Sequence, residues 1–279
     1  MKVSMIGLGK VGSATVFRLL NIKKIDEIML IDIIPKLLEG EYLDLLHASV
    51  GMGSSTKISC SGNIEDVKGS HLVIITAGFP RTNEASRLDL AKKNVAIIRD
   101  IMEKIKKVQS DCIILMVANP VDINTYMAIK FSGFKREHIF GMGPTLDFFR
   151  FKAVNPNAKM TMGEHGDSMV FVPYDSPKES QDYVKMISKR VIETKGGTWW
   201  APAIAISSIV ESIVEDKKDV KVVSTLLKGE YGISDVSLGV PVRLGYDGIE
   251  EIVKEKLEAQ ELESLRKSAD TLKDVIKQL

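Results

Sequence analysis

A histidine on a short segment rich in glycine and acidic residues is the first candidate for chemistry. His165 lies within residues 163–168, between two short strand-like stretches, and we expect a tight loop there. Imidazole exchanges a proton with an alcohol near neutral pH when a carboxylate orients it and stabilises its protonated form. The segment alone leaves an acid–base role and a structural role equally open. The other histidines, His47, His71 and His138, are interpreted as structural.

Three arginines could bind carboxylates. Asp147 and Arg150 would share one face of a helix, although a solvated ion pair is the simpler interpretation of that spacing. Arg81 and Arg87 belong to a segment that leaves the carboxyl end of a predicted strand, where ligands bind in open α/β sheets. Its small and polar residues would let it move as a lid. Because a guanidinium donates two parallel hydrogen bonds to a carboxylate, the arginines predict a small substrate with more than one carboxylate.

The glycines near the N-terminus indicate a dinucleotide site. Gly7, Gly9 and Gly12 form a G-x-G-x-x-G pattern between a predicted strand and a predicted helix, where unpaired backbone amides and the helix dipole favour a pyrophosphate. Asp32 ends the next strand and would accept hydrogen bonds from ribose hydroxyls. No basic residue follows Asp32 before Lys36, so the pattern favours NAD over NADP.

The elements that must position these residues change character near residue 142. Strands are predicted at residues 2–6, 27–31, 57–61, 71–77 and 112–118, separated by amphipathic helical stretches. This alternation predicts an α/β protein with a doubly wound parallel sheet of the Rossmann type over residues 1–142. Residues 143–279 read as an α+β catalytic domain, with paired strands at 220–227 and 236–244 and a C-terminal helix at 258–277.

Composition excludes several classes of protein. The 279 residues carry 38 Lys and Arg against 37 Asp and Glu, a formal net charge of +1, so neither nucleic acid nor an anionic membrane is favoured as a partner. No apolar run is long enough to span a membrane, and the apparent lack of a signal peptide favours a cytoplasmic location. Cys60 and Cys112 are expected to be core thiols, and no metal-binding spacing occurs.

In combination, the motifs resemble the lactate-dehydrogenase-like malate dehydrogenases of the lactate/malate dehydrogenase superfamily. The resemblance runs almost from end to end, through residues 7–14, 77–81, 118–122, 146–150, 163–168 and 267–273. It implies NAD-dependent interconversion of malate and oxaloacetate, a step of the tricarboxylic acid cycle, in a homodimer or homotetramer.

The resemblance also implies a role for each site residue. His165 would exchange the proton, Asp147 would orient the His165 imidazole, and Arg87 would polarise the reacting carbonyl. Substrate carboxylates would be bound by Arg150 and Arg81, and Arg81 would select a dicarboxylic acid over pyruvate. Asn119 would contact substrate or cofactor, and Asn94 is expected in the cofactor site.

The chain departs from that family pattern in two shortened segments. Residues 153–157 cut short the helix that follows Asp147, and residues 174–177 replace a longer stretch. Neither change removes a predicted catalytic residue, but the shortened helix bears on subunit contacts.

Two alternatives remain open from the sequence. One is a dehydrogenase for another 2-hydroxy acid such as lactate, although Arg81 would then lie unpaired over a methyl group. The other is a dinucleotide-binding or scaffold protein without turnover.

Overall fold

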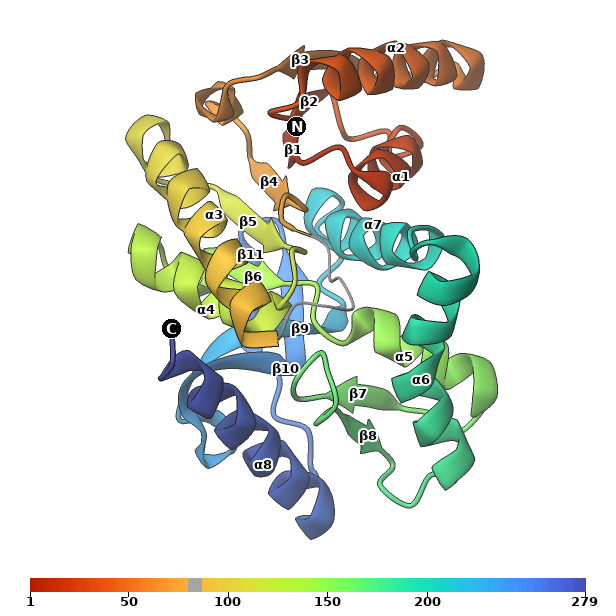
Figure 1. Cartoon of the computed structure of the whole chain (residues 1–279), viewed down its shortest axis with the longest axis vertical. Coiled ribbons are helices and arrows are strands. Elements are labelled where there is room, and N and C mark those ends of the chain that lie inside the picture. Colours follow the sequence, from red (N-terminus) through yellow and green to blue (C-terminus); the bar gives the residue numbers. More distant parts are fainter. Residues whose placement is uncertain (80–86) are drawn as a thin grey trace.

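The centre of the molecule is a twisted mixed sheet. The computed structural model describes residues 1–79 and 87–279, and its strand order is β11-β10-β9-β6-β5-β4-β1-β2-β3. The run from β3 to β6 is parallel and has the order 3-2-1-4-5-6 of doubly wound dinucleotide-binding sheets. Helices α3 and α4 lie side by side on one side of this sheet, and α1 and α7 lie side by side on the other (Figure 1). The predicted fold class is confirmed.

The bounds of the elements follow the chain in two groups. The first group contains β1 (Lys2–Ile6), α1 (Lys10–Leu19), β2 (Glu27–Ile31), α2 (Pro35–Met52), β3 (Lys57–Ser61), β4 (Leu72–Ile75), α3 (Arg87–Val108), β5 (Ile113–Met116), α4 (Val121–Ser132) and β6 (Ile139–Gly141). The second contains α5 (Thr145–Val154), β7 (Met160–Met162), β8 (Val170–Val172), α6 (Lys178–Lys195), α7 (Trp200–Val214), β9 (Val220–Lys228), β10 (Ser234–Gly245), β11 (Gly248–Ile252) and α8 (Ala259–Ile276).

The parallel strands and their helices form where the local sequence predicts them. Strands β4 and β5 are buried along their whole length, as expected for Val/Ile-rich strands that are covered on both faces. Helix α2 begins at Pro35, whose fixed φ suits a first helical turn, and ends at Gly53 in the left-handed conformation. Helix α5 ends at Val154, within the segment that the sequence predicts to shorten it.

The second half of the chain extends the same sheet. Strand β9 pairs antiparallel with β6 through Gly141 and Ser224, and β10 and β11 continue the antiparallel part. The predicted pairing of β9 with β10 is confirmed, whereas β6 and β11 are not predicted from the sequence. β6 has only three residues, so its strand character depends on its neighbours in the sheet.

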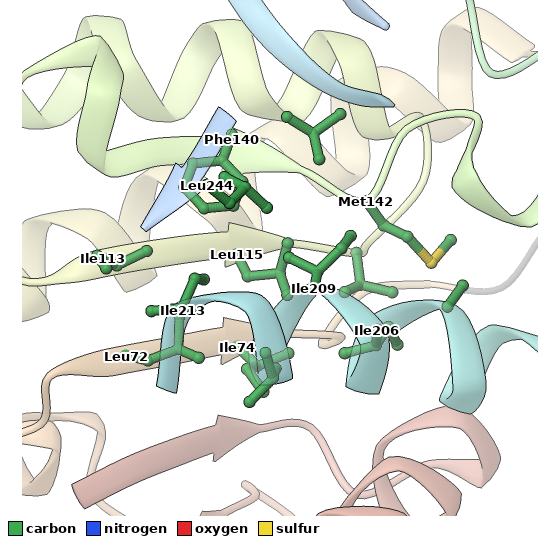
Figure 2. Packing of buried hydrophobic residues seen from close by; sticks show 14 of the residues in the cluster. Leu72, Ile74, Ile113, Leu115, Phe140, Met142, Ile206, Ile209, Ile213 and Leu244 are labelled. Atoms are coloured by element: carbon green, nitrogen blue, oxygen red, sulfur yellow. The ribbon is translucent and has the colours of Figure 1, made fainter. Parts of the chain in front are cut away.

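The hydrophobic core joins the two halves of the chain. Helix α7 is apolar around most of its circumference, and such a helix is stable in water only when it is covered on several sides. It packs across the sheet, as Figure 2 shows for its side chains Ile206, Ile209 and Ile213 and the strand residues Leu72, Ile74, Ile113 and Leu115. A helix from the C-terminal half of the chain therefore covers one face of the N-terminal parallel sheet.

The expectation for Cys60 needs correction. Strand β3 is an edge strand and is only partly buried, and its Cys60 is exposed and not a core thiol. Cys112 is buried, as predicted. Among the helices of residues 1–79 and 87–279, none combines the length and apolarity needed to cross a membrane.

Candidate active site

The glycine segment after β1 makes a tight turn that only glycine allows. Gly7 has φ +97°, and a Cβ there would come 2.6 Å from the backbone nitrogen of Ala77, just after the neighbouring strand β4. At Gly12 a Cβ would lie 2.0 Å from the carbonyl oxygen of Gly7, so this glycine lets α1 start directly against the turn. Both residues are needed for the backbone path, and their contact with a cofactor stays a prediction.

Gly9 differs because the space around it is open. It is the residue before the first turn of α1. Within the part of the chain that the structure describes, no atom lies within 4 Å of its side-chain position and no side chain caps the helix. The first amides of α1 are therefore free to bind an anion at the positive end of the helix dipole. This open, uncapped helix start fits the pyrophosphate of a dinucleotide.

Asp32 lies at the end of β2, beside the glycine turn. Its Oδ2 accepts a hydrogen bond from the backbone nitrogen of Leu8 at 2.7 Å, and its Oδ1 accepts one from that of Ile34 at 2.9 Å. The carboxylate thus joins the turn to the end of β2, a contact that the sequence does not reveal. Each oxygen keeps a further lone pair, so the predicted bonds to a ribose remain compatible with this geometry.

Asn94 lies on α3 and Asn119 follows the carboxyl end of β5, and their side chains differ in exposure. The Asn94 side chain is buried and bonds the backbone of Phe79, with Oδ1 accepting at 2.7 Å and Nδ2 donating at 3.1 Å. Its Nδ2 also donates to the carbonyl oxygen of Asn119 at 2.6 Å. Asn119 itself is exposed. Asn94 therefore positions the backbone at this sheet edge, and its direct contact with a cofactor stays a prediction.

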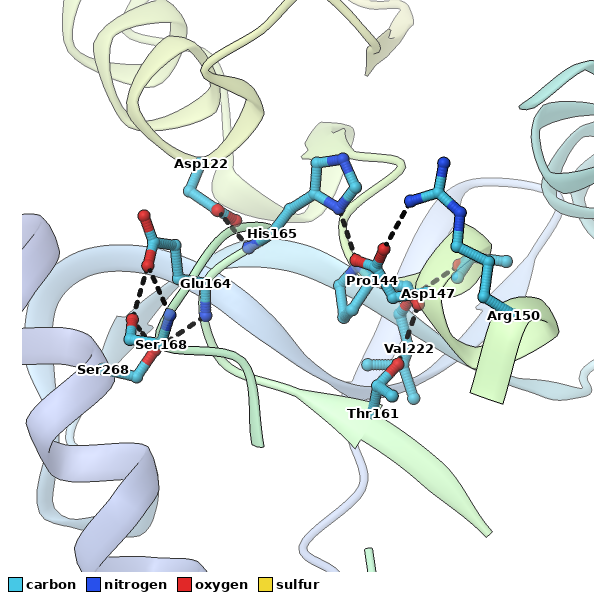
Figure 3. A network of polar contacts seen from close by, with 11 residues as sticks. Asp122, Pro144, Asp147, Arg150, Thr161, Glu164, His165, Ser168, Val222 and Ser268 are labelled. Atoms are coloured by element: carbon cyan, nitrogen blue, oxygen red, sulfur yellow. Dashed lines mark hydrogen bonds and ion pairs between the residues drawn. The ribbon is translucent and has the colours of Figure 1, made fainter. Parts of the chain in front are cut away.

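His165, Asp147 and Arg150 form a connected group (Figure 3). His165 Nδ1 lies 2.5 Å from Asp147 Oδ2, and Arg150 donates to Asp147 Oδ1 at 3.0 Å. The Asp147 side chain is only 1% exposed, and the His165 and Arg150 side chains are 15% and 14% exposed. Within the described residues, Nε2 of His165 has no hydrogen-bonding partner. A buried carboxylate therefore fixes the imidazole by one nitrogen, and the other is available for a substrate.

The electrostatics of this group favour a protonated imidazole. Burial acts to lower the pKa of His165, but the charge of Asp147 and the hydrogen bond to it outweigh burial, so the pKa lies above its ordinary value. Asp122 acts in the same direction as Asp147, and Arg150 opposes them. His165 is therefore suited to give a proton to a carbonyl oxygen near neutral pH and to take it back from an alcohol.

Three separate elements hold the loop that carries His165. Gly163 exchanges two backbone hydrogen bonds with Gly239 of β10, at 2.9 and 2.8 Å. The backbone nitrogen of Glu164 donates to Ser268 Oγ of α8 at 2.8 Å, and that of His165 donates to Asp122 Oδ2 of α4 at 2.8 Å. The loop is thus anchored to β10, α8 and α4 at three consecutive residues.

Sequence reasoning missed Asp122, Glu164 and Ser268 as parts of this site. Glu164 turns back on its own loop, where its Oε2 accepts from the backbone nitrogen of Ser168 at 3.0 Å and from its hydroxyl at 2.5 Å. Asp122 reads as an ordinary acidic residue in the first turn of a helix. The only available signal was that Asp122 stands among the apolar residues of α4, where a charged side chain is unexpected.

The predicted lid is only partly covered by the structure. Arg81 lies outside the described residues. Arg87 is the first residue of α3, which places its backbone beyond the carboxyl end of β4, and its side chain is not described. The roles of both arginines stay predictions.

The doubly wound sheet, the open helix start and the carboxylate–imidazole pair together define a dinucleotide-dependent oxidoreductase. Comparison with known families agrees with this class. Residues 1–141 match the NAD-binding domain of lactate/malate dehydrogenases, and residues 152–279 match their α/β C-terminal domain. The chain belongs to the lactate/malate dehydrogenase family, and NAD is its cofactor.

Relatives with two different substrates are equally similar. A malate dehydrogenase of Archaeoglobus fulgidus is 39% identical over 293 residues, which cover 100% of this chain and 99% of the relative. An L-lactate dehydrogenase of Acetivibrio thermocellus is also 39% identical, over 311 residues that cover 100% and 97%. The solved structure of the Archaeoglobus fulgidus enzyme in complex with NADH superimposes with a TM-score of 0.95 at 38% identity, covering 100% of this chain and 99% of that one. The choice of substrate therefore depends on individual residues.

Proposed function

We propose that this chain catalyses the NAD-dependent oxidation of malate to oxaloacetate and the reverse reduction. The observation that carries the proposal is Arg81, which follows residues 77–80 at the position where the family resemblance places the reader of a second carboxylate. An arginine there matches the distal carboxylate of oxaloacetate and has no partner on pyruvate. The buried Asp147 and the free Nε2 of His165 support the same class of chemistry.

The proposed reaction uses one proton and one hydride. Nε2 of His165 takes the proton of the C2 hydroxyl of malate while the C2 hydride leaves, and Asp147 stabilises the imidazolium that results. NAD, when bound, accepts that hydride. In the reverse direction the imidazolium returns its proton to the carbonyl oxygen of oxaloacetate. Arg150 grips the C1 carboxylate, and Arg87 polarises the C2 carbonyl.

The lactate alternative is favoured by the equally similar L-lactate dehydrogenase. It would leave Arg81 facing a methyl group, which costs affinity when the site excludes water. A binding or scaffold role without turnover is disfavoured because it gives no reason for a buried carboxylate that holds both an imidazole and a guanidinium.

The experiment that separates these functions follows the loss of NADH absorbance with purified protein. We expect turnover with oxaloacetate, and a kcat/KM for pyruvate lower by roughly two to four orders of magnitude. A preference for pyruvate would select the lactate alternative. No turnover with either acid, in a protein that still binds NADH, would select the binding role.

Asp32 is expected to set the preference of the enzyme for NADH over NADPH, because its carboxylate would repel a 2′-phosphate. In Asp32→Ser, the kcat/KM with NADH divided by that with NADPH should fall by about an order of magnitude or more. The activity with NADH should decrease and the activity with NADPH should increase. Steady-state kinetics with each cofactor would measure this ratio.

Asp32→Asn is the matched control for this prediction. Its amide oxygen can still accept from the Leu8 nitrogen, so it keeps the contact with the glycine turn while removing the charge, although the bond from the Ile34 nitrogen is lost. If Asp32→Asn leaves the cofactor ratio unchanged, the repulsion argument is wrong and Asp32 acts only by holding the turn.

Other expectations remain proposals with partial support. Helices α1, α2 and α7 carry exposed large apolar side chains, which favours a homodimer or homotetramer; these include Phe17, Leu43, Val50, Trp200 and Ile204. The two family matches support a division of the chain near residue 142, although the sheet is continuous across it. A cytoplasmic location and a place in the tricarboxylic acid cycle stay predictions.

A further inference from the structure

Asp122 is a buried carboxylate that the mechanism above does not use. It lies in the first turn of α4 and is 2% exposed. Its Oδ2 accepts the backbone N–H of His165 at 2.8 Å, and its Oδ1 has no hydrogen-bonding partner among the described residues. No described residue forms an ion pair with it. A buried carboxylate with so little compensation is costly to the fold, so a functional reason for it is worth seeking.

The surroundings of Asp122 bring its titration close to neutral pH. Burial raises the pKa of Asp122 to about 6, while the Ser224 hydroxyl on β9 and the N–H and charge of His165 act to lower it. Glu164, on the loop that carries His165 (the catalytic loop), acts to raise the pKa of Asp122. With a pKa of about 6, Asp122 is mostly ionised at pH 7 and above.

Two carboxylates therefore approach His165 from different elements. Figure 3 shows Asp147 of α5 at the imidazole ring and Asp122 of α4 at the backbone of the same residue. Among the described residues, Arg150 on α5 opposes the two carboxylates at His165, and Glu164, on the loop that carries His165, acts on Asp122. Asp147 holds the imidazole ring, and Asp122 holds the main chain of the same residue.

We propose that Asp122 is a positioning residue for His165, which fixes the catalytic loop through the His165 N–H and stabilises the imidazolium with its negative charge. The proposal rests on the proposed acid–base role of His165. It gives Asp122 two separable effects. Fixing the loop needs only an oxygen that accepts the His165 N–H, whereas stabilising the imidazolium needs a negative charge.

Asp122→Asn separates the two effects. The amide oxygen can still accept the His165 N–H, and the side chain keeps its size, but the charge is lost. We expect the midpoint of the His165 titration to fall by roughly half a unit to two units, as removal of a nearby charge in a partly buried site predicts. The measurement is a proton NMR titration of the imidazole in the protein without substrate or cofactor, with the His165 signal identified by its absence from His165→Gln.

The same variant should shift the activity profiles. Reduction requires the protonated imidazole and oxidation the neutral one, so the midpoints of both kcat/KM profiles should move to lower pH by about the same amount as the NMR titration. Asp122→Ala removes the acceptor as well as the charge, and should add a fall in kcat of about an order of magnitude or more because the loop loses an anchor. Asp175→Asn, at an exposed turn, is the matched control and should move neither midpoint.

The outcomes distinguish this proposal from the proposed function. A shifted His165 titration in a protein without dehydrogenase activity would support Asp122 and overturn the function. An active Asp122→Asn enzyme with an unchanged His165 titration would overturn the proposal and leave Asp122 a structural residue. If the variants do not fold, carbon-13 NMR of aspartate carboxyl groups in the unmodified protein decides. The chemical shift of the Asp122 carboxyl carbon must then change when His165 ionises as well as when Asp122 itself ionises. A chemical shift that does not change with the ionisation of His165 overturns the proposal.

Discussion

His165→Asn is expected to lose at least about two orders of magnitude in kcat while NADH binding is retained. Asparagine can still accept or donate one hydrogen bond but cannot exchange a proton near neutral pH. The glycine turn and Asp32 lie on other elements, at the ends of β1 and β2, so the cofactor site should be intact. Single-turnover hydride transfer and NADH fluorescence titration would measure the two properties separately.

The control for this prediction is His47→Asn, which changes an exposed histidine on α2 in the same way. It should leave both kcat and NADH binding unchanged. Near-full rates in His165→Asn would show that another group exchanges the proton. A parallel loss of NADH binding would show that the substitution damages the fold and not only the chemistry.

Arg81→Gln is expected to change the substrate preference more than any other single substitution. In the unmodified enzyme the guanidinium would form a charge-assisted pair with the distal carboxylate of oxaloacetate, and pyruvate would leave it without a partner. Glutamine removes both the attraction and the penalty. The activity with oxaloacetate should therefore fall while that with pyruvate rises, and the ratio of kcat/KM values should change by roughly two to four orders of magnitude.

Steady-state kinetics with both keto acids would measure this ratio. Arg190→Gln, at an exposed position of α6, is the matched control and should leave it unchanged. A ratio that hardly moves in Arg81→Gln would mean that Arg81 is a solvated surface charge. The selection of substrate would then depend on another residue, with the segment around Thr198 as the next candidate.

Local sequence patterns were sufficient for the first five strands of the doubly wound half. The Val/Ile-rich runs of β1 and β2 and the glycine turn between β1 and α1 are each encoded within a few neighbouring residues, so the strand bounds match the prediction. Strands β6 and β11 were missed for the opposite reason. Their short sequences have no distinctive pattern, and they become strands only because a neighbouring strand of the sheet pairs with them.

The sequence by itself determined the class of chemistry at the site. A histidine in a glycine-bounded segment, an arginine three residues after an aspartate and a glycine turn before a helix are local patterns, and each has a specific chemical use. The patterns single out candidates for the proton-exchanging group and the dinucleotide turn because the chemistry restricts which residue types can stand there, and the family resemblance assigns the roles.

Only the tertiary structure decided how these residues meet and what holds them. His165 is separated from Asp122 by 43 positions, and Glu164 from Ser268 by 104, yet each pair is joined by a hydrogen bond. Such contacts depend on how α4 and α8 pack against β9 and β10, which is set by burial of side chains from the whole chain. Asp122 looks like an ordinary acidic residue of a helix start until that packing places it in the interior, beneath His165.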